Sequence, residues 1–178
     1  MKILFTDYNW GKLVVVSSSV QKTDKEVLLE WFSSLRYPRL GEKSKLKILE
    51  EINDSNGQES LFTSLIRLKN VSCISFGANG ITVDINIVEL SRSCGKSTVI
   101  AYYKGGTYIS QSGILQSLEA IRHWARYLSW RYYTKEERAA IRKAVSEIPS
   151  LNVIIEGVVW NFESSILGDS LKVYIVKS

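Results

Sequence analysis

The chain has 178 residues, of which 45% are hydrophobic and 23% charged, and its formal net charge is +5. These ordinary globular values exclude a disordered chain and a membrane protein. No apolar run approaches the roughly 20 residues that a membrane span needs, and Asp7 interrupts the apolar start before a signal peptide could form. We therefore expect one cytoplasmic domain over residues 1–178, in which Cys73 and Cys94 are small buried residues.

The first half of the chain predicts two hairpins separated by helices. The β-rich runs 2–9 and 12–19 form the opening hairpin. A capping box at Thr23 and Glu26 then begins a helix. Its apolar face consists of Val27, Leu28, Trp31, Phe32 and Leu35, and Pro38 ends it.

A second helix is expected over 44–52, with Leu46, Leu49 and Ile52 on one face, whereas the run 60–70 fits either a helix or a strand. Residues 71–76 and 81–90 predict the next hairpin. In its second strand isoleucine and valine alternate with Thr82, Asp84 and Asn86, so we expect one face of this strand to be wet.

Gly95-Lys96-Ser97-Thr98 matches the last four positions of a phosphate-binding loop. Such a loop also needs a glycine five residues before Gly95, where this chain has Leu90, and it must open a helix. Here the β-branched and aromatic run 99–103 follows instead. We therefore predict that Gly95, Lys96 and Ser97 form a solvent-exposed turn before a strand, without a nucleotide function.

The second half predicts a hairpin, two helices and two final strands. The hairpin turns at 104–106, the helices follow within 113–148, and the strands 152–162 and 170–177 close the chain. Consecutive hairpins imply mainly antiparallel pairing. The expected fold is therefore α+β, with a twisted, mainly antiparallel sheet that carries its helices on one side.

The region of the two later helices is basic and aromatic. Residues 112–149 hold seven basic and four acidic side chains, and five of the nineteen aromatic residues lie within 124–133. The first helix is expected over 118–130, and the second begins at a capping box formed by Thr134 and Glu137. Helical spacing then exposes five residues as a candidate recognition surface: Arg122, Arg126, Trp130, Arg138 and Arg142. The alternative is structural, with aromatic rings that seat the helices on the sheet and arginines that are only solvated.

A second candidate surface is acidic. Residues 41–60 hold three basic and five acidic side chains, and the acidic ones are Glu42, Glu50, Glu51, Asp54 and Glu59. Catalytic patterns are weak by comparison: His123 is the only histidine, which excludes a site with two histidine ligands, and no G-x-S-x-G motif occurs. We expect no catalytic, metal-binding or cofactor-binding residues, and no enzymatic activity.

As a whole, the chain resembles the immunity proteins that bacteria encode beside contact-dependent growth inhibition toxins and related polymorphic toxins. The resemblance rests on its size, the signal-free start MKILFTDYNWGKLVVV, the α+β layout and the abundance of Ile, Lys, Ser and Asn. It implies a monomeric or weakly self-associating protein without a membrane partner, which binds and neutralises one cognate toxin stoichiometrically.

A nuclease is the expected toxin. Because a nuclease is positively charged where it holds nucleic acid, the acidic set is the expected blocking surface. The alternative function is an RNA-binding or RNA-processing domain that uses the basic, aromatic αα-hairpin at 113–148.

Overall fold

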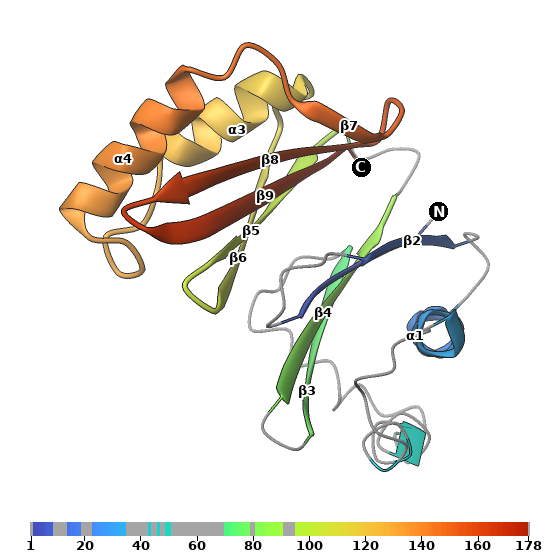
Figure 1. Cartoon of the computed structure of the whole chain (residues 1–178). Coiled ribbons are helices and arrows are strands. Elements are labelled where there is room, and N and C mark those ends of the chain that lie inside the picture. Colours follow the sequence, from blue (N-terminus) through green and yellow to red (C-terminus); the bar gives the residue numbers. More distant parts are fainter. Residues whose placement is uncertain are drawn as a thin grey trace. The chain divides into compact units, whose positions relative to one another are not determined.

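A computed structural model describes residues 2–8, 14–18, 23–34, 70–78, 81–90 and 95–177, together with positions 43, 46, 49 and 50. It consists of helices and antiparallel sheets, which confirms the α+β class (Figure 1). The chain divides into two compact units, residues 1–91 and 92–178, each with its own sheet, whereas the sequence analysis expected one sheet. That all residues form a single domain stays a prediction.

The first unit contains a four-stranded sheet with the order β2-β1-β4-β3. Its strands are β1 (Lys2–Tyr8), β2 (Val14–Ser18), β3 (Val71–Ala78) and β4 (Ile81–Glu89), and every pair is antiparallel. The two hairpins predicted from the sequence, β1–β2 and β3–β4, are both present. They meet through β1 and β4, which pair along their length.

Helix α1 (Asp24–Ser34) begins at the predicted capping box. The Thr23 N–H donates to Glu26 Oε2 over 2.6 Å, and the Glu26 N–H donates to Thr23 Oγ1 over 3.2 Å. Asp24, in the first turn, accepts hydrogen bonds from Lys2 Nζ and Ser72 Oγ, both over 2.6 Å, and so ties the helix to β1 and β3. The predicted apolar face is buried at Val27, Leu28, Trp31 and Phe32.

The expectation that β4 exposes the face of Thr82, Asp84 and Asn86 is wrong at Asn86. Asn86 on β4 is only 2% exposed, because β4 is a central strand and Asn86 lies opposite Phe5 on one side and Cys73 on the other. Positions 46, 49 and 50 are helical, as expected for 44–52; the Leu46 side chain is 56% exposed, and Leu49 is partly buried. Leu35, Pro38, Ile52, most of 60–70 and Cys94 lie outside the described residues.

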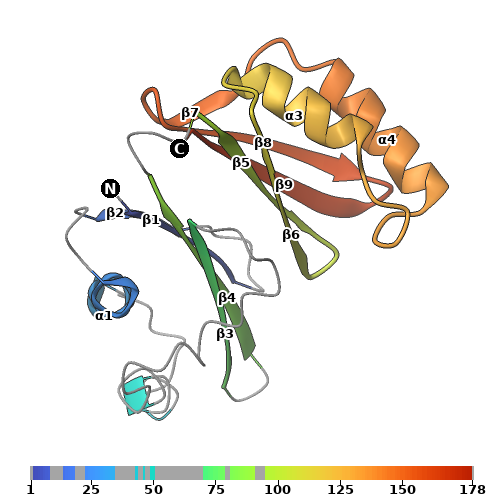
Figure 2. The same ribbon diagram turned by 180° about the vertical axis from the view of Figure 1, so that it is seen from behind.

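The second unit contains a five-stranded antiparallel sheet with the order β6-β5-β9-β8-β7. Its strands are β5 (Ser97–Tyr103), β6 (Gly106–Ser112), β7 (Asn152–Ile155), β8 (Val159–Ile166) and β9 (Asp169–Lys177). Helices α3 (Ser117–Arg126) and α4 (Lys135–Ser146) lie side by side over one face of this sheet (Figures 1 and 2). This unit therefore has the predicted layout, with its helices on one side.

The turns of the second sheet depend on residues with positive φ. Lys104 and Gly105 have φ of 50° and 73°, and Leu167 and Gly168 have φ of 52° and 94°, as expected for two-residue hairpin loops. The expected single strand over 152–162 is wrong: Gly157, with φ of 68°, lies in a turn that separates β7 from β8. A bond from the Val158 N–H to the Ile155 carbonyl closes that turn over 3.0 Å.

The stretch that resembles a phosphate-binding loop leads into β5 rather than a helix. Gly95 and Lys96 are exposed, and the strand begins at Ser97, which confirms the predicted strand. Ser97 itself is fully buried, contrary to the expected exposed turn. The reason is that its hydroxyl donates a hydrogen bond to the Ile114 carbonyl, on the segment that enters α3.

The helices and sheet of the second unit share one hydrophobic core. α3 contributes Ala120, Ile121, Trp124 and Ala125, α4 contributes Ile141 and Val145, and the sheet contributes Val99, Ala101, Tyr103, Leu171, Val173 and Ile175. Ile114, Leu118 and Ala144 are only partly buried and pack against the edge of this core. None of the helices among the described residues is long and apolar enough to cross a bilayer.

Candidate functional site

The segment between α3 and α4 presents three large aromatic side chains to solvent. Tyr127 and Trp130 are each 73% exposed, and Tyr132 is 62% exposed. We call residues 127–132 the aromatic loop. Neighbouring apolar side chains that remain exposed and are rimmed by polar residues mark interaction surfaces, because burying them against a partner is favourable. The aromatic loop is therefore the candidate functional site.

Two buried residues, one within the aromatic loop and one directly after it, anchor the loop to the core. Leu128 is 6% and Tyr133 3% exposed, and both belong to the core. The Tyr133 ring stacks on Tyr103, with 6.0 Å between ring centroids. Tyr108 on β6 lies 4.8 Å from Tyr133 and 5.5 Å from Tyr132. The sheet thus holds the loop from behind, which lowers the entropy that a partner would have to remove on binding.

The loop backbone is also closed by hydrogen bonds. The Ser129 carbonyl accepts from the N–H groups of Tyr132 and Tyr133, over 3.2 and 3.1 Å, and the Ser129 hydroxyl accepts from the Arg131 N–H over 3.2 Å. At the other end the Tyr127 N–H donates to the carbonyls of His123 and Trp124. These bonds fix the conformation in which the three rings are exposed.

Basic side chains lie beside two of the exposed rings. The Arg131 guanidinium lies 5.8 Å from the centre of the Trp130 ring, and the His123 ring lies 4.6 Å from Tyr127. A guanidinium over an exposed ring contributes about 0.5–1 kcal/mol and leaves the other face of the ring accessible. The loop therefore combines aromatic and basic groups, which are typical of surfaces that bind proteins or single-stranded nucleic acid.

A buried carboxylate fastens α4 next to the aromatic loop. Glu137, 5% exposed, completes the predicted second capping box: its Oε2 accepts from the Thr134 N–H over 2.7 Å, and its N–H donates to Thr134 Oγ1 over 3.2 Å. Its Oε1 accepts from Lys104 Nζ over 2.5 Å and from the Tyr103 hydroxyl over 3.4 Å. Lys104 Nζ also lies 3.4 Å from an Asp169 carboxylate oxygen, so one cluster joins α4 to two hairpin turns.

The protonation of this cluster follows from its contacts. The hydrogen bond from Lys104, and next that from the Thr134 N–H, hold the pKa of Glu137 below its ordinary value. The same contact with Glu137 raises the pKa of Lys104. Burial is the main reason that the pKa of Tyr133 is raised, and its hydroxyl has no hydrogen-bond partner in the described part of the chain. Glu137 and Lys104 are thus an ion pair at neutral pH, beside a neutral tyrosine.

This ion pair predicts a pH-dependent contribution to stability. Glu137→Gln keeps an oxygen for the Thr134 N–H but removes the charge that Lys104 contacts. Because the folded pKa of Glu137 is lowered, the ionised carboxylate stabilises the fold above its unfolded pKa of about 4.3, and this contribution is lost as pH falls through the folded pKa. At neutral pH we expect the variant to be about 1 kcal/mol less stable than the wild type.

Urea denaturation from pH 7 down to pH 3 measures this effect. The difference in unfolding free energy between wild type and Glu137→Gln should narrow at the acid end. Glu136→Gln is the matched control, because Glu136 is exposed in the same helical turn and should show little difference at any pH. A difference for Glu137→Gln that stays constant over the whole range would contradict the ion pair.

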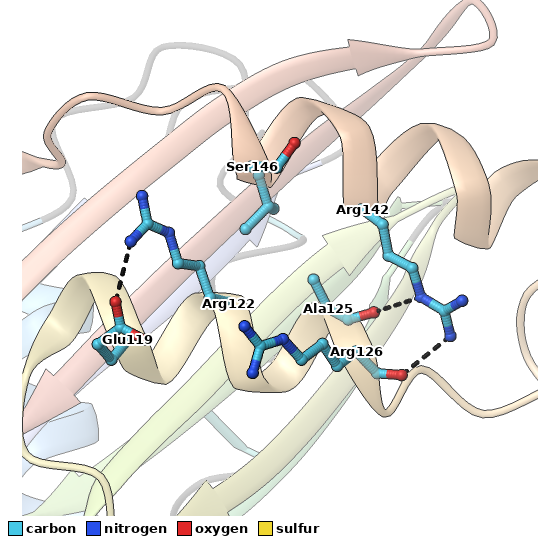
Figure 3. A pocket seen from close by; sticks show the side chains of 7 residues that line it. Glu119, Arg122, Ala125, Arg126, Arg142 and Ser146 are labelled. Carbon is cyan, nitrogen blue, oxygen red and sulfur yellow. Dashed lines mark hydrogen bonds and ion pairs between the residues drawn. The ribbon is translucent and has the colours of Figure 1, made fainter.

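A groove of about 420 Å³ lies between α3 and α4 (Figure 3), lined by Glu119, Arg122, Ala125, Arg126, Arg142, Val145 and Ser146. Arg142 Nε donates to the Ala125 carbonyl over 3.1 Å, and its Nη2 donates to the Arg126 carbonyl over 2.9 Å. Arg142 of α4 therefore satisfies two carbonyls at the carboxyl end of α3, where a cation is also favoured by the helix dipole.

The structure brings together only part of the basic set predicted from the sequence. Arg122, Arg126 and Arg142 line the groove. The sequence predicted that Trp130 lies on the same helical face as these arginines. It does not, because α3 ends at Arg126 with Tyr127 as its C-cap. Arg138 does not line the groove either, and its Nε donates to the Thr134 carbonyl over 3.3 Å.

The acidic set is described at one residue. Glu50 is exposed and helical, whereas Glu42, Glu51, Asp54 and Glu59 lie outside the described residues. The acidic surface therefore stays a prediction.

The structure also describes one of the two cysteines and the grouping of possible metal ligands. Cys73 is a free, partly buried thiol whose pKa is raised by burial and then by Asp84. Within the described residues no three His, Cys, Asp or Glu side chains are grouped so that they could hold a metal ion.

Sequence reasoning missed several groups at this site. The sequence assigns Lys104 only to a hairpin turn, and no pattern in it singles out the groove residues Glu119 and Ser146. The Lys104–Glu137 contact spans 33 residues, and no local pattern reveals it. The position of Lys104 beside a glycine in a hairpin turn is the one feature of the sequence that could have pointed to this contact.

Comparison of the chain with protein-family models, curated proteins and solved structures finds no match.

Proposed function

We propose that this protein is an immunity protein that binds and neutralises a bacterial toxin, and that the aromatic loop is its recognition surface. The observation that carries the proposal is the exposure of Tyr127, Trp130 and Tyr132 on a loop fixed by the core. Tyrosine and tryptophan dominate the binding energy of protein interfaces because they bury a large area at little conformational cost. We propose that the protein acts by forming a one-to-one complex rather than by catalysis.

The contacts of the arginines favour a protein partner over nucleic acid. Arg122 pairs with Glu119 over 2.9 Å, Arg142 bonds to two backbone carbonyls, and Arg138 bonds to a third. Binding to single-stranded RNA depends on cations that neutralise successive phosphates along the strand. In this protein several arginine side chains already form hydrogen bonds or ion pairs within the fold, whereas the aromatic rings are exposed.

A basic, aromatic surface also constrains how a nuclease toxin would be inhibited. The cleft in which a nuclease holds nucleic acid is positive and would repel Arg126 and Arg131. We therefore propose that the aromatic loop contacts the toxin away from that cleft. If the acidic segment at 42–59 is the contact instead, the cleft itself becomes the expected target.

RNA binding is the second candidate function. It is favoured by the Arg131 guanidinium over the Trp130 ring, since bases stack on such rings while arginine holds phosphates. The two functions differ in their response to salt. RNA affinity falls steeply with salt concentration because counterions are released, whereas a packed protein interface responds weakly.

The test is coexpression with the product of the adjacent reading frame. We expect that product to be toxic alone and harmless when coexpressed, and to elute with this protein as a one-to-one complex in size-exclusion chromatography. A harmless product, or the absence of a complex, contradicts the proposal. Tight binding of purified protein to single-stranded RNA, lost at high salt, would favour the second candidate.

A further inference from the structure

We propose that the groove between α3 and α4 receives a carboxylate side chain, aspartate or glutamate, of the protein partner. This inference rests on the proposed function and adds a second contact to the aromatic loop. The groove and the aromatic loop are adjacent in the chain. Arg126, the last residue of α3, lines the groove, and the next residue, Tyr127, begins the aromatic loop. One extended segment of a partner can therefore reach both the groove and the exposed rings.

Arg126 supplies the main binding group. Its side chain is exposed, and it forms no ion pair with any of the described residues, in contrast to Arg122 on the preceding helical turn. Figure 3 shows Arg122 and Arg126 extending from α3, with Arg142 reaching across from α4 to the end of that helix. Arg126 is thus available to an incoming anion.

Arg142 is positioned to assist. A guanidinium has five N–H donors in a planar fork, and Arg142 uses one at Nε and one at Nη2 for the carbonyls at the end of α3. The donors that remain are held in a fixed orientation, so little entropy is lost when they bind a carboxylate.

The composition of the groove favours a protein carboxylate over a nucleic-acid phosphate. Glu119 lies in the same groove as the arginines, so both signs of charge are present. Ala125 and Val145 add apolar atoms to the lining. A phosphate backbone is uniformly negative and would be repelled by Glu119, whereas a protein segment can place an acidic residue near Arg126 and an apolar or basic residue near Glu119.

The groove can be probed with a synthetic peptide of about twelve residues that alternates glutamate with leucine and glycine. Its binding is measured by nuclear magnetic resonance, from the Nε–Hε signals of the arginine side chains. We expect saturable shifts for Arg126 and Arg142. Arg126→Gln should raise the dissociation constant about tenfold, as expected for the loss of one charge-assisted pair.

Lys143→Gln is the matched control. Lys143 is an exposed cation on α4 that does not line the groove, so its loss lowers the net charge equally and should change the affinity less than about twofold. Both substituted side chains are exposed, and thermal melts verify that each variant folds. If both variants weaken peptide binding equally, the peptide is attracted by the net charge of the protein and the proposed site is wrong. A peptide titration that does not shift the Arg126 signal would contradict the site as well.

A single-stranded oligoadenylate with the same charge as the peptide completes the experiment. If it binds more tightly than the peptide and shifts the same arginine signals, the groove is a phosphate site and the inference is wrong. Failure of the proposed function is read separately, from coexpression with the adjacent gene product. A one-to-one complex that forms equally well with Arg126→Gln would remove this inference and leave the proposed function in place.

Discussion

Replacing Trp130 with alanine should weaken binding of the cognate toxin at least thirtyfold and leave the stability of the free protein almost unchanged. The ring is 73% exposed, so its removal costs the folded monomer little buried area. The substitution removes the contact with the Arg131 guanidinium, which at an exposed site contributes about 0.5–1 kcal/mol. Central aromatic residues of interfaces contribute about 2 kcal/mol or more, which corresponds to roughly thirtyfold in affinity.

Titration calorimetry with the coexpressed toxin measures this effect, with denaturation curves to monitor folding. Leu115→Ala is the control, because Leu115 is 47% exposed but lies before α3, outside the aromatic loop. It should bind the toxin with wild-type affinity. If Trp130→Ala also binds normally, the aromatic loop is not the recognition surface, and the acidic segment at 42–59 becomes the next candidate.

Ile121→Ala should destabilise the second unit by about 2–5 kcal/mol, the range for large-to-small substitutions in a core. Ile121 has no exposed surface and lies in the cluster where α3 packs on the sheet. The cavity left behind cannot be refilled by the surrounding branched side chains without strain. Urea denaturation followed by circular dichroism should show a lower midpoint.

Leu118→Ala on the same helix provides the comparison. Leu118 is only partly buried at the edge of the cluster, so it should cost clearly less than Ile121→Ala. Similar costs for the two variants would argue against the observed orientation of α3. Toxin binding by the folded fraction of either variant should be retained, since both residues lie on α3, outside the aromatic loop.

The features that sequence predicted well depend on neighbouring residues. Both capping boxes, at Thr23 and at Thr134, occur as expected, because each needs only a hydroxyl and a carboxylate three residues apart. The hairpin turn at 104–106 was also predictable, since glycine adopts positive φ without a steric penalty. Helical periodicity also predicted that Val27, Leu28, Trp31 and Phe32 share one apolar face, and all four are buried.

The features that could not be predicted depend on contacts between distant residues. Periodicity shows that an element has a buried face, but not which sheet covers it, so two sheets could not be told from one. The first of the two later helices was expected to reach Trp130, whereas α3 ends at Arg126, where its last carbonyls accept hydrogen bonds from Arg142, sixteen residues further on. The candidate site was found only in part for the same reason: aromatic enrichment was visible, whereas exposure of Tyr127, Trp130 and Tyr132 depends on the fold.

The bond from Arg142 to the end of α3 also sets an order of events during synthesis. The aromatic loop leaves the ribosome before α4 does, and until residue 142 has followed, the carbonyls of Ala125 and Arg126 lack the guanidinium that holds them. Lys104, which pairs with Glu137 on α4, likewise meets its second partner, Asp169, only after the strands β7 and β8 have been made. The surface that we propose for toxin binding therefore matures late, when the carboxyl-terminal strands have been made, and a truncated chain would carry the rings without the scaffold that orients them.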